Sequence, residues 1–208
     1  MENVITALEV QKHNKERVNV FLDGVYAFAV SLLAAAQLRK GQRLTPEQIA
    51  ELKAEGAVDL AYQRALRYLS LRPRSEGEMV TYLEGKEYEE RVIAAVMARL
   101  REKGYVDDGA FARFWVDNRT RFRPRGARAL RYELRQKGVE SSTIDEALED
   151  QDEEAAAWAA VENKIDRWQA LPREEFTQKL MGFLARRGFG YGVCRQVAER
   201  AWRQLHGE

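Results

Sequence analysis

The sequence predicts a mainly α-helical protein made of tandem repeats, preceded by a small antiparallel β-sheet. Three observations support this fold class. From Leu60 onward, apolar residues recur at spacings of three and four and proline is scarce, which is typical of helices. The residues before Ser31 instead include alternating, β-branched and aromatic runs, which favour strands. The helical part also aligns with itself at a shift of about 50 residues, which indicates internal repeats.

Three short segments near the N-terminus are predicted to be strands. Apolar and polar residues alternate through Ile5 to Val10, and apolar, β-branched and aromatic residues dominate Val18 to Leu22 and Val25 to Val30. Between the last two segments lies Asp23-Gly24, a pair that readily adopts the positive φ angles of a two-residue hairpin turn. We therefore expect a small antiparallel sheet.

After Ser31 the pattern changes to that of a helix. The segment Thr45-Pro46-Glu47-Gln48 combines an N-cap residue, a proline at the first helical position and a glutamine that can complete a capping box. Gly56 follows where a glycine often stops a helix, so we expect a short helix to end there.

A weak internal repeat runs through the helical part. Arg72-Pro73-Arg74 recurs as Arg123-Pro124-Arg125, at an offset of 51. This offset, followed by one of 50, aligns three sets of residues: Met79 with Leu130 and Leu180, Leu83 with Leu134 and Leu184, and Ile93 with Ile144 and Cys194. Because the residues of the first two sets lie four apart on one helix, each of the three units is expected to bury them on one helix face.

The helix that follows the repeated Arg-Pro-Arg motif has recognisable ends. Proline fits its first turn, where the missing N–H costs nothing. Gly138 and Gly188 occupy matching stop positions in the second and third units. The first unit has Glu87 there, so a different turn is expected.

Composition limits the class of protein. Of 208 residues, 45% are hydrophobic and 32% are charged, which favours a folded helical protein over a disordered one. Met1 to Leu8 lacks the features of a signal peptide, and no apolar run is long enough to span a bilayer. Cys194 is the only cysteine, which excludes an internal disulfide and a cysteine-rich metal site. We expect a cytoplasmic protein that does not enter a membrane.

Charge is strongly segregated although the formal net charge is only +1. Arg119 to Lys137 holds eight basic residues against one acid, Glu133, whereas Glu140 to Glu154 holds eight acids and no base. Such segregation can give one surface a strong positive potential on a nearly neutral molecule.

The spacing within the basic run predicts a binding surface. On a helix, one exposed stripe would contain Arg125, Arg128, Arg131 and Arg135, with Arg121 and Arg123 leading into its N-terminal end. Phosphate or an acidic protein surface would suit this stripe. The alternative is an ordinary solvated face that the following acids neutralise.

Other polar motifs have structural explanations. Arg186 to Gly192 lacks the spacing of a phosphate loop or a dinucleotide fingerprint, so a helix stop and turn is expected, with the arginine pair available to a partner. Asp107-Asp108 and Glu89-Glu90 lie near predicted helix starts, where carboxylates cap free N–H groups. With two histidines and one cysteine, the chain offers no catalytic triad or metal cluster, so we expect no enzyme and no cofactor.

Four motifs follow one another along the chain. They are Leu69-Ser70-Leu71-Arg72-Pro73-Arg74-Ser75-Glu76; Gly104-Tyr105-Val106-Asp107-Asp108 with Phe111-Ala112; Leu134-Arg135-Gln136-Lys137-Gly138-Val139; and Phe183-Leu184-Ala185-Arg186-Arg187-Gly188-Phe189. Their order and spacing resemble the RecX family from residue 60 to residue 205, and the strand-rich start resembles the N-terminal extension of its longer members. The resemblance implies tandem three-helix repeats that bind the RecA recombinase, lodge in the groove of its nucleoprotein filament and usually restrain filament growth and strand exchange.

On this basis we expect an elongated, curved array of three helical repeats, at 59–108, 109–156 and 157–208, after a sheet and short helix at 1–58. The expected activity is mainly negative modulation of RecA, through contact with RecA and its filament on single-stranded DNA. Direct DNA binding is expected to be weak and without sequence preference, and the chain to be a monomer.

The candidate residues for contact with RecA or DNA are all basic. They are Arg72, Arg74, Arg119, Arg121, Arg123, Arg125, Arg128, Arg131, Arg135, Lys137, Arg186 and Arg187. The alternative function is a transcription regulator of the helix-turn-helix type, which would bind specific DNA sites as a dimer.

Overall fold

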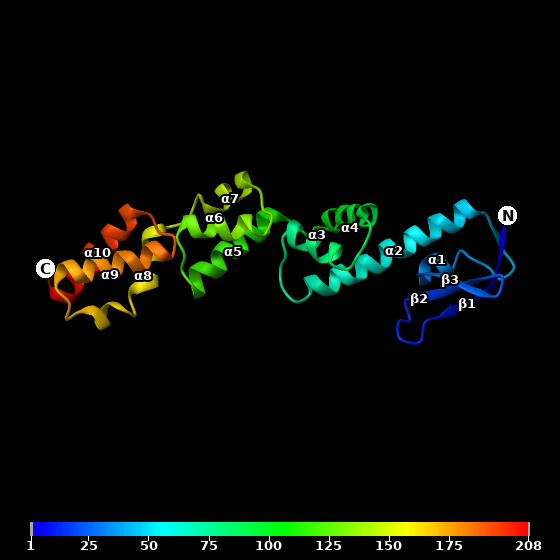
Figure 1. Cartoon of the computed structure of the whole chain (residues 1–208), viewed down its shortest axis with the longest axis horizontal. Helices are drawn as coiled ribbons and strands as arrows, with labels where there is room; N and C mark the ends of the chain where they lie inside the picture. Colours follow the sequence, from blue (N-terminus) through cyan, green and yellow to red (C-terminus); the bar gives the residue numbers. More distant parts are fainter. Residues whose placement is uncertain (1, 208) are drawn as a thin grey trace. The chain divides into compact units, whose positions relative to one another are not determined.

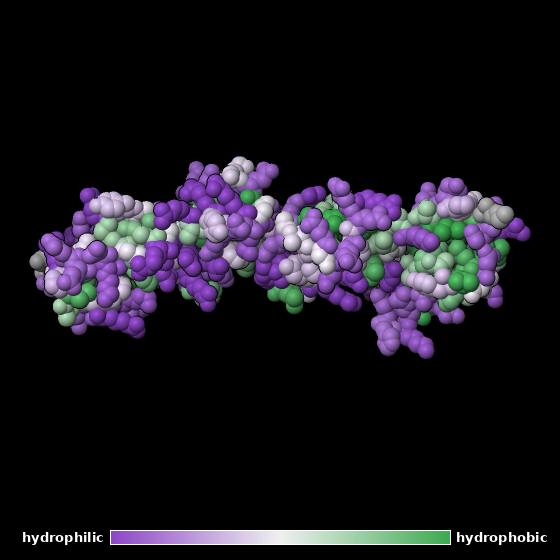
Figure 2. Space-filling model, viewed as in Figure 1, coloured by the Kyte–Doolittle hydropathy of each residue, from purple (hydrophilic) through white to green (hydrophobic). Residues whose placement is uncertain are grey.

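The structure, a computed structural model, describes residues 2–207. These residues form two compact units (Figure 1). Unit 1 comprises the residues up to Pro73 together with Met79–Tyr105, and unit 2 comprises Arg74–Glu78 together with the residues from Val106 onward. Figure 2 shows apolar surface on the part of unit 1 that holds the sheet, whereas polar residues cover most of the visible face of unit 2.

Unit 1 begins with a four-stranded antiparallel sheet in the order β3-β2-β1-β4. The strands are β1 (Asn3–Val10), β2 (Arg17–Leu22), β3 (Val25–Ser31) and β4 (Arg43–Leu44). The three predicted strands are confirmed, and β4 adds a short edge that the sequence pattern did not indicate. Asp23 and Gly24 have φ angles of +49° and +87°, which confirms the predicted hairpin turn.

Helix α2 (Pro46–Leu69) packs on β3 and begins at the predicted capping box of Thr45 and Gln48. The expected helix end at Gly56 is wrong, because α2 continues for three more turns beyond it. A Cβ atom at Gly56 would collide with the carbonyl oxygen of Ala29 in β3. The glycine therefore permits a close approach of helix to strand and does not mark a stop.

The buried Arg17 strengthens this packing from the sheet side. Its guanidinium donates hydrogen bonds to the carbonyl oxygens of Ala29 at 2.8 Å and Gly56 at 3.1 Å, so it joins β3 to α2. Burial lowers the pKa of Arg17 from its ordinary value.

All the remaining regular secondary structure in residues 2–207 is helical. In chain order the helices are α1 (Leu32–Ala35), α2, α3 (Glu76–Glu84), α4 (Glu90–Glu102), α5 (Asp108–Phe122), α6 (Ala127–Arg135), α7 (Ser141–Leu148), α8 (Glu153–Val161), the 3-10 helix η1 (Ile165–Trp168), α9 (Arg173–Arg186) and α10 (Tyr191–His206). In this part of the chain, no helix combines the length and apolar character needed to cross a membrane.

The internal repeat is confirmed by burial. The residues at most 8% exposed include all nine aligned ones: Met79, Leu130 and Leu180; Leu83, Leu134 and Leu184; Ile93, Ile144 and Cys194. In unit 2 these residues belong to two separate three-helix cores, one formed by α5–α7 and the other by α8–α10. We call these the α5–α7 bundle and the α8–α10 bundle.

The turn after α3 corrects one expectation. Glu87 adopts a φ of +61°, close to the +80° of Gly138 and the +89° of Gly188. The next residue in each unit donates its N–H to the carbonyl of Leu83, Leu134 or Leu184, as in a Schellman turn. The first unit therefore makes the same turn with a glutamate, and the expectation of a different turn is wrong.

Candidate nucleic-acid interface

The candidate site lies where the α5–α7 and α8–α10 bundles meet inside unit 2. The short link between α5 and α6 is held by main-chain contacts, because the N–H of Gly126 donates to the carbonyl of Arg187 at 3.0 Å. The guanidinium of Arg187 in turn donates to the carbonyl of Pro124 at 3.3 Å. Burial lowers the pKa of Arg187 from its ordinary value, and the positive charge of Arg125 lowers it further by a smaller amount.

Two side chains, one at the start of α8 and one just before it, hold the same link from the other side. The carboxylate of Glu153 accepts a hydrogen bond from the N–H of Ala127 at 2.6 Å, and the amide of Gln151 donates to the carbonyl of Arg125 at 3.1 Å. Glu153 thereby caps the N-terminus of α6, a helix whose own N-cap residue, Gly126, supplies no side chain. The α8–α10 bundle thus fixes the position of the arginines around α6.

Two glycines allow the bundles to approach this closely. A Cβ atom at Gly126 would collide with the backbone of Gly188, and one at Gly188 would collide with Ala129. Gly188 also has a φ of +89°, which suits glycine. The sequence pattern indicated only the helix stop at Gly188 and did not reveal the contact with Gly126.

An open groove of about 500 Å³ lies over this junction. Its lining includes Arg125, Arg128, Tyr132, Glu133, Ala185 and Arg186. Arg128 is exposed and donates to the carbonyl of Ala185 at 3.1 Å, and within residues 2–207 no carboxylate pairs with it. We call this feature the junction groove. It brings together three of the predicted residues: Arg125, Arg128 and Arg186.

Part of the predicted basic surface is neutralised inside the protein. Glu133 accepts hydrogen bonds from Trp115 at 2.8 Å and Arg119 at 2.7 Å, and Arg125 lies 3.7 Å from its second oxygen. Lys137 pairs with Glu78 at 2.9 Å and lies over the ring of Trp115. Arg119 and Lys137 are therefore mostly buried structural partners.

The expected unbroken stripe of arginines is wrong. Helix α6 begins at Ala127, so Arg125 precedes the helix, because the backbone at Gly126 is extended where it meets the α8–α10 bundle. Arg131 is in the expected helix but pairs with Asp145 of α7 at 3.0 Å. The alternative of a face neutralised by the acidic run thus applies to Arg131.

Five of the predicted basic residues remain exposed without a carboxylate partner in the described part of unit 2: Arg121, Arg123, Arg128, Arg135 and Arg186. Arg121 and Arg135 lie in the last turns of α5 and α6, where the helix dipole favours a cation. Of the other two predicted residues, Arg72 lies in unit 1 and donates to the carbonyl of Pro73, and Arg74 is partly buried in unit 2.

Exposed aromatic side chains, which the sequence pattern did not indicate, accompany these arginines. Phe122 is 74% exposed between Arg121 and Arg123, and Tyr132 is 66% exposed in the junction groove. Aromatic faces beside guanidinium groups suit single-stranded nucleic acid, because bases stack while phosphates pair with the cations. The signal that could have found them is an aromatic residue placed within a basic run.

Four family models match consecutive parts of the chain. They are described as the Regulatory protein RecX N-terminal domain over residues 3–45 and as the first, second and third three-helix domains of RecX over residues 61–100, 107–148 and 151–198.

Full-length relatives and a solved structure agree with these matches. The Regulatory protein RecX of Bacillus subtilis is 37% identical over 94% of this chain and 76% of its own length, and that of Bacillus pumilus is 32% identical over 95% and 77%. A crystal structure of regulatory protein RecX superposes with a TM-score of 0.76 at 31% identity, covering 95% of this chain and 99% of the other. The chain therefore belongs to the RecX family of regulatory proteins.

Proposed function

We propose that the protein modulates RecA, mainly by restraining filament growth and strand exchange, and that the junction groove contacts the RecA–DNA filament. The observation that carries the proposal is the grouping of Arg125, Arg128 and Arg186 in one open groove beside the exposed ring of Tyr132. Family membership supports a regulatory role of the RecX type.

The chemistry of the groove favours a polyanion. Each guanidinium can donate two parallel hydrogen bonds to one phosphate, and the tyrosine ring can stack on a base. Single-stranded DNA within a RecA filament offers both groups. Guanidinium contacts to phosphates and stacking on the face of a base carry little sequence information, so binding is expected to be independent of sequence.

The protein would act by occupying the surface of the filament. A chain seated on the filament covers the DNA that must pair during strand exchange, and it hinders addition of further RecA protomers. ATP hydrolysis in this scheme belongs to RecA, and the protein contributes binding energy alone.

The test compares two charge reversals in RecA-catalysed strand exchange and DNA-dependent ATP hydrolysis. Arg128→Glu with Arg186→Glu reverses two exposed cations of the groove, while Arg167→Glu with Arg203→Glu makes the same charge change on exposed arginines outside it. We expect the wild type and the second variant to inhibit both reactions and the first variant to lose most of the inhibition. Wild-type protein that leaves RecA activity unchanged would refute the proposed function, and equal inhibition by both variants would refute the groove.

A further inference from the structure

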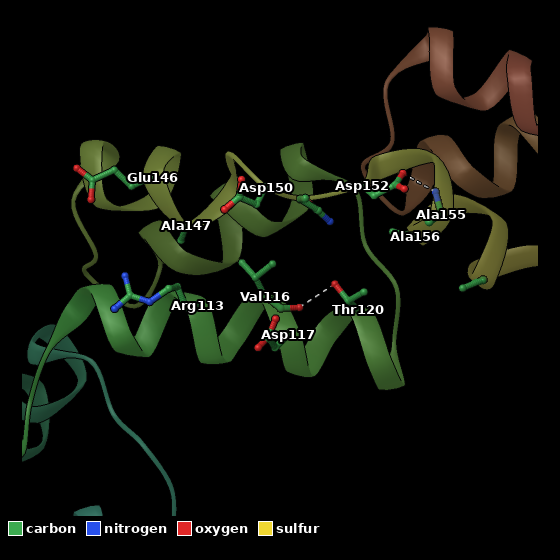
Figure 3. A pocket seen from close by; sticks show the side chains of 12 residues that line it. Arg113, Val116, Asp117, Thr120, Glu146, Ala147, Asp150, Asp152, Ala155 and Ala156 are labelled. Carbon is green, nitrogen blue, oxygen red and sulfur yellow. Dashed lines mark hydrogen bonds between the residues drawn. The ribbon is translucent and has the colours of Figure 1, made fainter.

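A second groove in unit 2 differs in character from the junction groove (Figure 3). It has a volume of about 540 Å³ and lies between α5, α7 and α8. Its apolar floor consists of Val116, Ala147, Ala155, Ala156 and Ala159. Because four of these five side chains are single methyl groups, the groove is open enough to admit the side chains of another polypeptide.

The rim of this groove is acidic. Asp117, Glu146 and Asp150 are exposed, and none of them has a cationic partner within residues 2–207. Asp152 also lines the groove, but its carboxylate is engaged as the N-cap of α8, where it accepts from the N–H of Ala155 at 2.9 Å. Arg113 is the one basic residue in the lining. We call this feature the acid-rimmed groove.

One buried polar atom of the lining also lacks a partner. Gln151 donates from its side-chain nitrogen to the carbonyl of Arg125, but its side-chain oxygen is buried and accepts no hydrogen bond from any described residue. A buried acceptor without a donor is locally unfavourable.

The chemistry of the rim and the floor selects the class of ligand. Carboxylates repel phosphate, so nucleic acid is a poor occupant. A metal ion needs several ligands converging on one point, and no group of three or more suitable side chains does so within the described residues. Spaced carboxylates above a floor of alanines instead match a polypeptide that presents lysine or arginine beside small apolar side chains.

We propose that the acid-rimmed groove binds a segment of a protein partner that carries lysine or arginine beside small apolar residues such as alanine. The lysines or arginines of that segment pair with Asp117, Glu146 and Asp150, and its small apolar side chains cover the alanine floor. This inference goes beyond the proposed function, since it assigns a protein-binding face that is separate from the cationic groove and does not depend on the identity of the partner.

The test measures binding of a short, fluorescein-labelled peptide of alanine and lysine to the full chain by fluorescence anisotropy. The groove variant combines Asp117→Asn, Glu146→Gln and Asp150→Asn, and the control variant combines Glu140→Gln, Glu162→Gln and Glu175→Gln, which are also exposed acids. We expect the groove variant to bind about tenfold more weakly, because each exposed pair contributes modestly, and the control variant to match the wild type. Both variants lose the same number of charges, so a difference reports position and not net charge.

Two further measurements locate the peptide and identify the interaction. In amide NMR spectra of the wild type, the peptide is expected to shift the signals of Ala155 and Ala159. The variant Ala159→Arg places a cation on the exposed floor of the groove and is expected to abolish peptide binding. No binding by the wild type, equal affinities of the groove and control variants, or shifts confined to other residues would overturn the proposal. Spermine displacing the peptide at equal charge concentration would also overturn it, because it would show attraction of cations without docking. RecA activity is not read in these assays, so their outcome is independent of the proposed function.

Discussion

Replacing Glu153 with alanine removes the side chain by which the α8–α10 bundle caps α6. In the structure its carboxylate accepts from the N–H of Ala127 at 2.6 Å, and neither residue is fully exposed. Without it, the N–H of Ala127 has no side-chain acceptor, and the charge at the positive end of the helix dipole is lost. We expect unit 2 to lose stability and the link that carries Arg125 to become less ordered.

The magnitude follows from the type of contact. Removing an N-cap acceptor costs about 0.5–2 kcal/mol, and hydrogen bonds to charged groups lie in the upper part of that range. We therefore expect Glu153→Ala to lower the free energy of unfolding by about 1.5 kcal/mol. The adjacent Glu154→Ala is the matched control, because Glu154 is exposed and lies 4.0 Å from Arg200, a pair expected to contribute about 0.5 kcal/mol or less.

Urea unfolding followed by tryptophan fluorescence is the suitable assay. The four tryptophans of the chain, Trp115, Trp158, Trp168 and Trp202, all lie in unit 2, so their emission reports this unit. A free energy of unfolding of Glu153→Ala equal to that of the wild type would refute the capping role of Glu153. Loss of the same stability in both variants would indicate that net charge, and not the cap, is responsible.

Three further predictions concern single residues. Glu87→Gly relieves a φ of +61° and is expected to raise the free energy of unfolding by about 0.5–1 kcal/mol, while Thr81→Gly within α3 is expected to lower it by about as much. Urea unfolding followed by circular dichroism measures both changes, and a destabilised Glu87→Gly would contradict the left-handed turn at this position. Gly126→Ala places a Cβ atom against the backbone of Gly188 and is expected to lower the free energy of unfolding by at least about 2 kcal/mol. Gly190→Ala has open space around it and is expected to lower it far less. Similar melting temperatures of the two variants would contradict the close approach of Gly126 to Gly188. Burial raises the pKa of the Cys194 thiol, so it stays protonated at pH 8 and reacts slowly with iodoacetamide until urea unfolds the chain; rapid labelling of the native protein would refute its burial.

Local sequence patterns predicted the elements whose causes are local. Asp23-Gly24 supplies the positive φ angles of its hairpin within two residues, and Thr45 with Gln48 forms its capping box within one turn. The buried face of each repeated helix was also predictable, since Leu83, Leu134 and Leu184 recur at nearly constant intervals. The family resemblance to RecX, stated from motif order, is confirmed by the family models and relatives.

Two predictions, the helix end at Gly56 and a different turn at Glu87, were wrong for reasons that a local sequence pattern does not contain. Gly56 packs against Ala29, a strand residue that the chain pattern does not connect to it, so the glycine was mistaken for a helix stop. Glu87 takes a left-handed conformation that glycine usually provides, because the surrounding Schellman hydrogen bonds determine the turn. The divisions predicted near residues 58, 108 and 156 stay predictions.

The sequence predicted the candidate site as a set of basic residues, and in the fold some of them pair with carboxylates while others line the junction groove. Glu133 lies within the basic run in sequence, and folding places it between Trp115, Arg119 and Arg125. Arg186 is far along the chain from Arg128, yet both line one groove, because the two bundles meet at Gly126 and Gly188. Which arginines bind a partner stays a prediction, and Tyr132 joins them as a candidate.

The salt dependence of binding to RecA filaments on single-stranded DNA tests the central claim most directly. If Arg128 and Arg186 each neutralise one phosphate, the double charge-neutral variant Arg128→Gln with Arg186→Gln should reduce the slope of log affinity against log salt by about 1.4, since each phosphate contact with a single strand contributes about 0.7. Arg167→Gln with Arg203→Gln should leave the slope unchanged. An identical slope for the wild type and both variants would contradict the assignment of the junction groove as the surface that meets the filament.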